Sequence, residues 1–278
     1  MDNTTIYICT YHEEDNIQDC INSIKKNEYQ NIVVIDASKD DLTKQKIQAV
    51  GIRVIKATKG LAGQRQKAID DCETKYLMFV DADDRLDKNC IKTLLQEIKN
   101  NDYDAIQANL RVLEPKSYWE KGMDANLAYC INSIGRTNML GRPAIYKTEV
   151  LKQVGMDISF NGVGNEDAAL SIKMEKYGAL QGKGSGISYR YHPKSFKENF
   201  NAWKKYGLGD AQLIRQYPNK FFNIVKHLLY VYPIKRSFDY IKNGETKYIG
   251  YSILCGFIRF YFMMLSLIID IFRNGKKK

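Results

Sequence analysis

Short apolar runs alternate with segments of helical periodicity over the first hundred residues. The runs are rich in β-branched residues and occupy residues 5–9, 32–35, 53–57 and 76–80. Between the first two runs, apolar side chains at helical spacing form one face, which consists of Ile17, Cys20, Ile21 and Ile24. Further helices are predicted over residues 42–50, 62–72 and 88–99. Such alternation is typical of a parallel sheet covered by helices, so the pattern predicts an α/β fold that begins βαβαβαβ.

The pattern loosens over residues 115–141 and then becomes regular again. A strand is predicted over residues 144–146 and a helix around Val150. The segment NEDAALSIKMEKYG predicts another helix, which Asn165 would cap and Gly178 would close. The segment GKGSG, residues 182–186, lacks the GxxxxGK[ST] order and the strand-to-helix context of a phosphate-binding loop. We interpret it as a hairpin or loop.

Residues 248–269 form an apolar stretch with one charge, Arg259, at its centre. The stretch is long enough to span a bilayer, but an arginine at mid-membrane costs roughly 2.5 to 3.5 kcal/mol. A weakly polar stripe recurs every three or four residues and consists of Ser252, Gly256, Arg259, Met263, Ser266 and Asp270. This narrow polar stripe and the basic residues on both flanks favour a monotopic or re-entrant anchor over a span.

The net charge of +10 is concentrated near the carboxyl end, where residues 223–278 carry ten Lys or Arg against three acids. A local excess of this kind suits an anionic surface, either a bilayer or a nucleic acid. No zinc-finger, homeodomain or RNP pattern accompanies it, so we expect a membrane surface and no nucleic acid. The six cysteines show no CxxC spacing, and the chain begins MDNTTIYICTY without a secretory signal. Both features predict free thiols and a cytoplasmic location.

Polar residues follow the predicted strands at the sheet edge where ligands of open parallel sheets bind. A single acid after a strand is usually a turn or capping residue, but here acids follow several strands. In FVDADD, Asp81 and Asp83 stand two residues apart, where both could reach one divalent cation. Carboxylate oxygens suit Mg²⁺ or Mn²⁺, which in turn bridge phosphate oxygens. A DxD pattern alone occurs often by chance.

The ordered combination of motifs resembles glycosyltransferase family 2, the inverting enzymes of GT-A fold, of the kind that builds bacterial surface glycans. The resemblance covers residues 4–192 and rests on ICTYHEED, VVIDASKDD, KGLAGQRQKAI, FVDADDRL and GNEDAALSIK. It implies a Rossmann-like, mostly parallel sheet flanked by helices, with a catalytic domain over residues 1–195 and a helical membrane-associating region over residues 196–278. Residues 115–141 would then be an insert specific to the acceptor.

The family's site residues carry over onto matching positions of this sequence. Asp167 corresponds to the catalytic base, Asp83 to a metal ligand, and His192 to a further metal ligand that some members supply. The implied nucleotide-sugar site includes Asp36 at the nucleobase, Asp81 at the ribose, and Thr10, Tyr11, Glu13, Lys59, Arg65 and Glu166 around them. Two other interpretations stay open: Glu166 and Asp167 could simply complement a helix dipole, and His192 could be a turn or packing residue.

The resemblance implies transfer of a sugar from a nucleoside diphosphate sugar, with a UDP sugar favoured, and a need for Mg²⁺ or Mn²⁺. Together with the basic tail, it implies a saccharide acceptor, in particular a lipid-linked one, at the cytoplasmic face of the membrane. QLIRQ, residues 212–216, lacks the tryptophan of the QxxRW element of processive synthases, which favours transfer of a single sugar.

The sequence departs from the family in two motifs. Cys-Thr-Tyr-His replaces the common Pro-Thr-Tyr-Asn in the first loop, and Ala37 follows Asp36 where a second Asp is common, so the donor base stays open. The alternatives are a sugar-nucleotide-forming nucleotidyltransferase, whose glycine-rich amino-terminal loop is missing, and a catalytically inactive membrane-bound scaffold.

Overall fold

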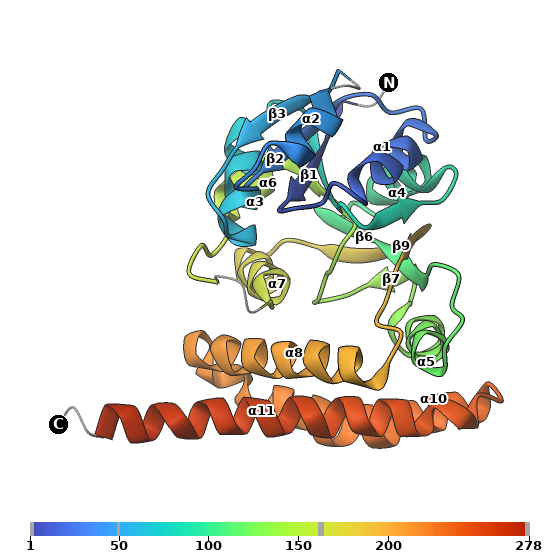
Figure 1. Ribbon diagram of the computed structural model, residues 1–278, viewed down its shortest axis with the longest axis vertical. Helices are drawn as coiled ribbons and strands as arrows, with labels where there is room; N and C mark the ends of the chain where they lie inside the picture. Colours follow the sequence, from blue (N-terminus) through green and yellow to red (C-terminus); the bar gives the residue numbers. More distant parts are fainter. Residues whose placement is uncertain (1–2, 49–50, 161–163, 276–278) are drawn as a thin grey trace. The chain divides into compact units, whose positions relative to one another are not determined.

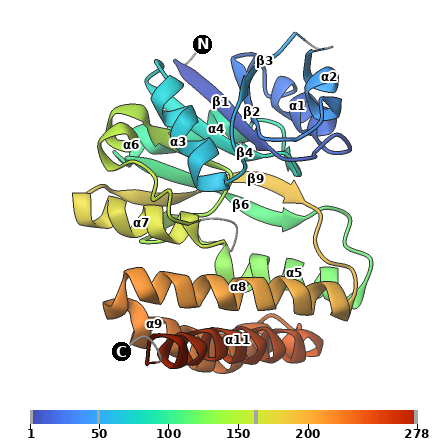
Figure 2. The ribbon, with the colours of Figure 1, turned by 60° about the vertical axis from the view of Figure 1, so that its left-hand side comes forward.

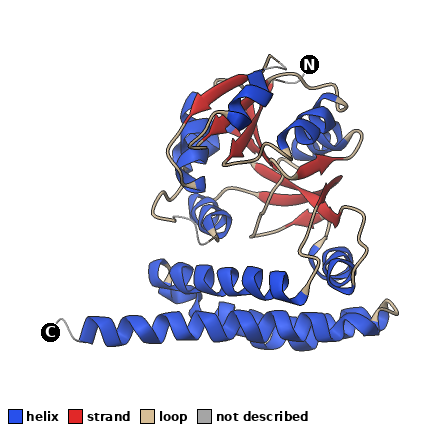
Figure 3. Ribbon diagram, viewed as in Figure 1, coloured by secondary structure: helices blue, strands red, loops and turns tan. Residues whose placement is uncertain are grey.

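The computed structural model describes residues 3–48, 51–160 and 164–275. The chain forms two compact units. Unit 1 comprises Met1–Arg111, Ser133–Gly162 and Glu166–Tyr191, and unit 2 comprises Val112–Asn132, Val163–Asn165 and His192–Lys278. The strands belong to unit 1, whereas unit 2 is built from helices (Figure 3).

Unit 1 is a sheet with helices on both faces (Figures 1 and 2). Its strands are β1 (Thr4–Thr10), β2 (Ile32–Asp36), β3 (Arg53–Lys56), β4 (Tyr76–Asp81), β5 (Asp84–Leu86), β6 (Ala105–Val112), β7 (Gly135–Arg136), β8 (Ala144–Lys147) and β9 (Gln181–Arg190). Its helices are α1 (Ile17–Lys25), α2 (Leu42–Gln48), α3 (Leu61–Asp71), α4 (Cys90–Asn100), α6 (Thr148–Val154) and α7 (Glu166–Tyr177). The predicted βαβαβαβ start is confirmed, although Val50 of the predicted second helix lies outside the described residues.

The sheet has the strand order β3-β2-β1-β4-β8-β6-β9-β5, and β7 pairs with β9. The first four strands are parallel, whereas β8 pairs antiparallel with both β4 and β6, and β5 pairs antiparallel with β9. The carboxyl ends of β1, β2 and β4 therefore meet at one edge, where Thr10 pairs with Asp36 and Cys9 with Asp81.

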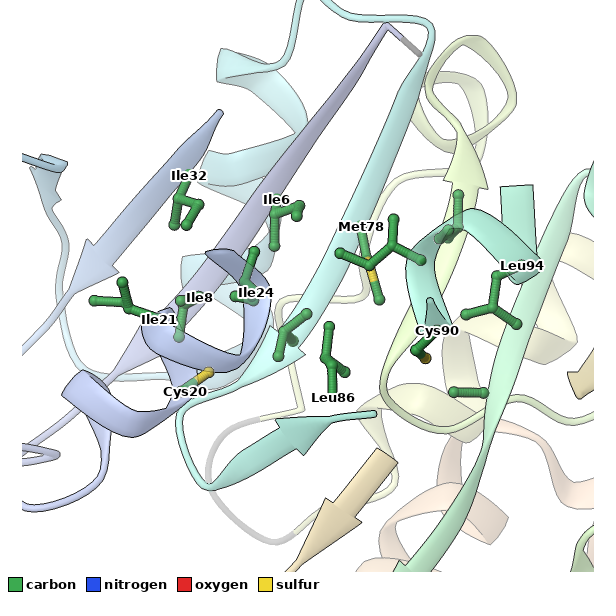
Figure 4. Close-up of a cluster of buried hydrophobic side chains, with 14 of the residues drawn as sticks. Ile6, Ile8, Cys20, Ile21, Ile24, Ile32, Met78, Leu86, Cys90 and Leu94 are labelled. Carbon is green, nitrogen blue, oxygen red and sulfur yellow. The ribbon is translucent and has the colours of Figure 1, made fainter. Parts of the chain in front are cut away.

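One face of the sheet packs against α1 and α4 through a continuous apolar core. Figure 4 shows Cys20, Ile21 and Ile24 of α1 directed at the strands that carry Ile6 and Ile8. Side chains alternate along a strand, so Tyr7 points to the other face. There its hydroxyl donates to Asp71 of α3 at 2.8 Å. All six cysteines are free thiols, as predicted.

The interpretation of GKGSG as a hairpin or loop is wrong, because residues 182–186 lie inside β9. The glycines let this strand pass close beneath α4. A Cβ added at Gly186 would lie 2.8 Å from the carbonyl oxygen of Cys90, and one at Gly184 would lie 2.6 Å from Leu94 and closer still to Glu97. Glycine is required here for close approach and not for a turn.

Unit 2 consists of α5 (Tyr118–Asn126), η1 (Leu127–Ile131), α8 (Phe196–Gln216), η2 (Pro218–Lys220), α9 (Phe221–Lys226), η3 (His227–Lys235), α10 (Arg236–Lys242), η4 (Thr246–Tyr248) and α11 (Ile249–Gly275). Its core is rich in aromatic side chains, including Trp203, Tyr232, Tyr240 and Tyr251. The segment predicted to be an insert thus contributes α5 and η1 to the helical unit.

Candidate active site

Thr10 and Asp36, at the ends of β1 and β2, lie together as the sequence predicts. Asp36 is fully buried and accepts hydrogen bonds from Thr10 Oγ1 at 3.0 Å, Ser38 Oγ at 2.6 Å and Lys56 Nζ at 3.1 Å. Burial alone would raise the pKa of Asp36, but the bonds from Ser38, Lys56 and Thr10 lower it below the ordinary value. Asp36 is therefore an ionised hydrogen-bond acceptor, and its neighbours hold its carboxylate in place at the sheet edge.

The loop after β1, which contains Tyr11, contacts the loop after β3, which contains Lys59. Lys59 Nζ lies 4.0 Å from the centroid of the Tyr11 ring, a cation–π contact. The ring of Tyr11 also packs edge-on against His12, and His12 Nδ1 lies 3.1 Å from Asp40 Oδ2. Glu13 accepts from Asn16 Nδ2 at 3.1 Å, and burial raises its pKa.

Arg65 of α3 joins three acids to which the sequence assigned roles. Its side chain is only 1% exposed. Nη2 donates to Asp81 Oδ1 at 3.0 Å, and Nη1 donates to Glu166 Oε1 at 2.8 Å and to Asp167 Oδ1 at 2.7 Å. A single guanidinium thus connects the end of β4 with the first two residues of α7. The acids of the DxD and Glu-Asp motifs, far apart in sequence, form one cluster.

Arg142 is a member of this cluster that the sequence did not reveal. It is 3% exposed and forms an ion pair with Asp167. Because β8 runs antiparallel to β4, with Phe79 opposite Ala144, the residue two before Ala144 approaches the end of β4 near Asp81. The only local signal would have been a basic residue just before a predicted strand.

Arg190 of β9 is the second residue that the sequence missed. It stands opposite Asp84 in the β5–β9 pairing. Its Nε donates to Asp84 Oδ1 at 2.9 Å and its Nη2 donates to Asp81 Oδ2 at 2.8 Å, while Nε lies 3.4 Å from Asp83 Oδ1. Arg190 thus lies beside both aspartates of the DxD motif, and its position follows from an antiparallel pairing that local sequence does not encode.

The aspartates of this motif differ in environment. Asp84 is fully buried, and burial together with Asp81 and Asp83 raises its pKa to about 7 despite Arg190. Asp81 is surrounded by arginines, and although burial opposes this, Arg190, Arg65 and Arg142 hold its pKa well below the usual range. The Asp83 side chain is 39% exposed, and its pKa is raised by partial burial and by Asp81. Asp83 is the accessible carboxylate.

The two acids at the start of α7 also have opposite pKa shifts. Burial raises the pKa of Asp167, in spite of Arg142 and Arg65. Burial acts on Glu166 as well, but the two arginines outweigh it and lower its pKa. Glu166 therefore holds its negative charge to lower pH than an ordinary Glu, and Asp167 accepts a proton more readily than an ordinary Asp.

The cluster carries more negative than positive side chains. Three arginines face five carboxylates, namely Arg65, Arg142 and Arg190 against Asp81, Asp83, Asp84, Glu166 and Asp167. The raised pKa values of Asp84 and Asp167 show that this excess of carboxylates makes ionisation of the cluster harder. Across the described ranges, no group of three or more His, Cys, Asp or Glu side chains is arranged to hold a metal ion. Asp83 is an accessible carboxylate, and carboxylate oxygen is the ligand type that Mg²⁺ takes in proteins, usually one or two together with substrate phosphates.

His192 belongs to unit 2, whereas the acids of the cluster belong to unit 1. It lines a cavity of about 100 Å³ within unit 2, together with Asn199, Trp203, Tyr232 and Arg259. Its assignment as a metal ligand stays a prediction.

Comparison with known proteins identifies the family. The model of "Glycosyl transferase family 2" matches residues 5–164, more than half of the chain. The chain belongs to glycosyltransferase family 2. It is 35% identical over 112 residues to the teichoic acid poly(glycerol phosphate) polymerase of Staphylococcus epidermidis. That alignment covers 37% of this glycosyltransferase and 16% of the polymerase, so the chain spans a small part of that relative.

Solved structures show that the glycosyltransferase has the GT-A fold. S. aureus TarS matches with a TM-score of 0.55 and 18% identity over 73% of this chain and 38% of that chain. TarS 1-349 matches with a TM-score of 0.55 and 16% identity over 99% of this chain and 92% of that chain. GalNAc-T7, solved with UDP, GalNAc and Mn²⁺, matches with a TM-score of 0.57 and 14% identity over 74% of this chain and 47% of that chain. At these identities the likeness concerns the fold alone.

Proposed function

We propose that this glycosyltransferase moves a single sugar from a nucleoside diphosphate sugar, preferentially a UDP sugar, to an acceptor hydroxyl with inversion at the anomeric carbon. The observation that carries the proposal is the bonding of Arg65 to Asp81, Glu166 and Asp167 at the sheet edge. It joins the motif expected to hold the donor to the motif expected to hold the base.

In this proposal Asp167 is the catalytic base. Both Arg65 and Arg142 contact its Oδ1, so we assign proton transfer to Oδ2. As the acceptor oxygen attacks the anomeric carbon, Oδ2 takes the hydroxyl proton and the bond to the diphosphate oxygen breaks on the opposite face. The two arginines keep Asp167 in position, and their charge keeps it ionised in a buried setting.

The donor would lie along the ends of β1, β2 and β4. We assign Asp36 to the nucleobase, Asp81 to the ribose, and Thr10, Tyr11, Glu13, Lys59, Arg65 and Glu166 to the rest of the nucleotide sugar. Asp83, with His192 as a further candidate, would hold Mg²⁺ or Mn²⁺. A bound divalent cation would neutralise the charge that develops on the leaving diphosphate. The mutual contacts of Thr10 with Asp36 and of Lys59 with Tyr11 support this assignment.

We further propose that residues 1–195 carry catalysis and that residues 196–278 associate with the cytoplasmic face of a membrane, where the acceptor is a lipid-linked saccharide of bacterial surface glycan assembly. The partial likeness to a teichoic acid polymerase supports this class of acceptor. Within the described residues, Thr246–Asp270 has the length and apolar character of a membrane span, with a mean hydropathy of 2.0 and 22% of its most apolar window buried.

Nucleotide binding tests the proposal without a known acceptor. The melting temperature of the full chain is measured with UDP, GDP, CDP or dTDP, each with and without Mn²⁺, for wild type and Asp83→Ala. Ligand at 100 times its Kd stabilises the folded state by about 2.7 kcal/mol, so binding to one nucleotide raises the melting temperature. We expect an Mn²⁺-dependent shift that Asp83→Ala abolishes. The exposed Asp87, replaced by alanine, is the matched control and keeps the shift.

Absence of a shift with all four nucleotides would overturn the proposed donor site and support the inactive scaffold. A shift that is equal in wild type and Asp83→Ala would remove Asp83 from the metal site.

A further inference from the structure

The polar side chains of α11 face inward, onto the other helices of unit 2. The guanidinium of Arg259, at the centre of the apolar stretch, pairs with both carboxylate oxygens of Asp210 in α8, at 2.9 Å from Nη2, and donates to the hydroxyl of Tyr232 at 2.9 Å. The Asp210 side chain is 6% exposed and that of Arg259 is 15% exposed. The one charge in the middle of the stretch is therefore neutralised inside the protein.

The polar groups on either side of Arg259 are bound in the same way. Ser252 is fully buried and its hydroxyl donates to the carbonyl oxygen of Tyr232 at 2.7 Å. Near the other end, Arg215 of α8 donates to Ser266 Oγ at 2.7 Å and to Asp270 Oδ2 at 2.6 Å. The polar stripe predicted from the sequence is thus the face of α11 that packs on unit 2.

The outer face of α11 carries exposed apolar side chains at helical spacing. We call this set the apolar row, and it consists of Leu254, Phe257, Tyr261, Leu265, Ile268 and Phe272. The steps between its members are three or four residues, so the row lies along one side of the helix. Phe257 is 52%, Tyr261 59% and Phe272 69% exposed. A continuous exposed row of this kind marks an interaction surface.

A transmembrane orientation of α11 conflicts with its packing. Helix α8 lies alongside α11, as Figures 1 and 2 both show, and runs in the same direction, since Gly207 approaches Arg259 and Arg215 reaches Asp270. Crossing a bilayer would carry the exposed Lys204 and Lys205 of α8 into hydrocarbon. Each such charge costs roughly 2.5 to 3.5 kcal/mol at the membrane centre. Separating α11 from α8 would instead leave Arg259 without Asp210.

We infer that α11 lies in the plane of an anionic bilayer, with the apolar row inserted among the upper acyl chains and not spanning. Charge complementarity selects this occupant, because unit 2 also exposes Lys226 and Lys242, besides Lys235 and Lys247, which form ion pairs with Asp239 and Glu245. Each lysine near an anionic surface contributes about 1 kcal/mol to binding. The inference rests on the proposed membrane association of residues 196–278 and is independent of the transferase chemistry.

Vesicle flotation with the full chain tests this orientation. Wild type is expected to float with vesicles of phosphatidylglycerol and phosphatidylcholine, and at least tenfold less with phosphatidylcholine alone or in high salt. Phe257→Ser/Tyr261→Ser is expected to lower binding to the anionic vesicles at least tenfold. Tyr177→Ser, which removes an exposed tyrosine of α7 in unit 1, is the control and leaves binding unchanged.

A second variant guards against misfolding. Lys226→Glu/Lys242→Glu alters exposed charges only and is expected to weaken flotation with anionic vesicles while the melting temperature stays that of wild type. To separate insertion from spanning, Phe257→Trp is compared with wild type for fluorescence quenching by lipids brominated near the head group or near the chain end. Stronger quenching near the head group is expected.

Unchanged flotation of both double variants would overturn the inference, as would strongest quenching at the chain end. A wild-type dimer in sedimentation velocity that Phe257→Ser/Tyr261→Ser dissociates, without vesicle binding by either, would show that the row joins two copies. Because the nucleotide-dependent melting shift is measured separately, failure of vesicle binding and failure of the donor site are distinguishable.

Discussion

Arg65 Nη1 donates to Asp167 Oδ1 at 2.7 Å, from a side chain that is itself only 1% exposed. This bond ties helix α3 to the amino-terminal turn of α7. It places a fixed positive charge on the carboxylate that we propose as the base, so the strength of that base depends on its arginine neighbours.

Asp167→Asn keeps the shape of the side chain but cannot accept the acceptor's proton. We expect kcat to fall by about 10² to 10⁴, the usual contribution of a general base, with little change in donor KM. Steady-state rates measured over a range of donor concentrations give both kcat and the donor KM. Asp87→Asn, at an exposed carboxylate of unit 1, is the control, and equal rates in Asp167→Asn and wild type would exclude the base assignment.

The acid limb of the pH–rate profile should report the pKa of Asp167. Burial raises this pKa above that of an ordinary Asp, and the base works only when ionised, so kcat falls as pH falls through it. Arg142 lowers the pKa, so Arg142→Met is expected to raise it further and move the acid limb to higher pH. An acid limb that stays in place would mean that another group controls it.

Arg190→Met leaves Asp81, Asp83 and Asp84 together without their nearest cation. Removing one partner of a buried ion pair costs about 3 to 5 kcal/mol of unfolding free energy. Because three carboxylates then face one another, Mn²⁺ should restore stability and raise the melting temperature of the variant more than that of wild type. Arg190→Lys keeps the charge but loses the forked geometry of the guanidinium, so its melting temperature should lie between those of Arg190→Met and wild type. The melting temperatures of Arg190→Met and wild type are measured with and without Mn²⁺. An increase on adding Mn²⁺ that is the same in both proteins would count against a cation site here.

Gly256 of α11 packs against the backbone of η3. A Cβ at this position would lie 2.5 Å from the carbonyl oxygen of Leu228 and 2.8 Å from Cβ of Tyr232. Gly256→Ala is therefore expected to cost about 1 to 3 kcal/mol in unfolding free energy. Gly63→Ala in α3 meets nothing within 4 Å and should gain up to about 1 kcal/mol from helix propensity. Denaturant unfolding gives the free energy of unfolding of both variants. Similar free energies for Gly256→Ala and Gly63→Ala would show that α11 can move to accept the added methyl group without loss of stability.

Local sequence was sufficient for the first half of the sheet. The strands around Ile6 and Met78 and the helix around Ile21 follow from periodicity. A buried strand appears as a short continuous apolar run, whereas in an amphipathic helix the apolar residues recur every three or four positions. The strand-end position of Asp36 and Asp81 follows as well, since parallel strands end at one edge. The strand that contains GKGSG was missed because its glycines are required by close packing on α4, which is not a local property.

The site was predicted from sequence only as far as its motifs extend. Asp81 and Asp167 were found through motifs and are joined in the structure by Arg65. Arg142 and Arg190 were not found, because antiparallel pairings of β8 and β9 bring them to the cluster from distant segments. Such pairings depend on the whole sheet and leave no periodic trace near either arginine.

The sequence by itself determined that residues 248–269 are apolar, long enough to span a bilayer and interrupted by one charge. It did not determine the direction in which that charge points. The tertiary structure decided this by placing Asp210 opposite Arg259, so that the polar side of α11 is satisfied within the protein and the apolar row faces outward. The physical reason is that a buried charge needs a partner, and this partner lies on a helix nearly fifty residues away in the chain.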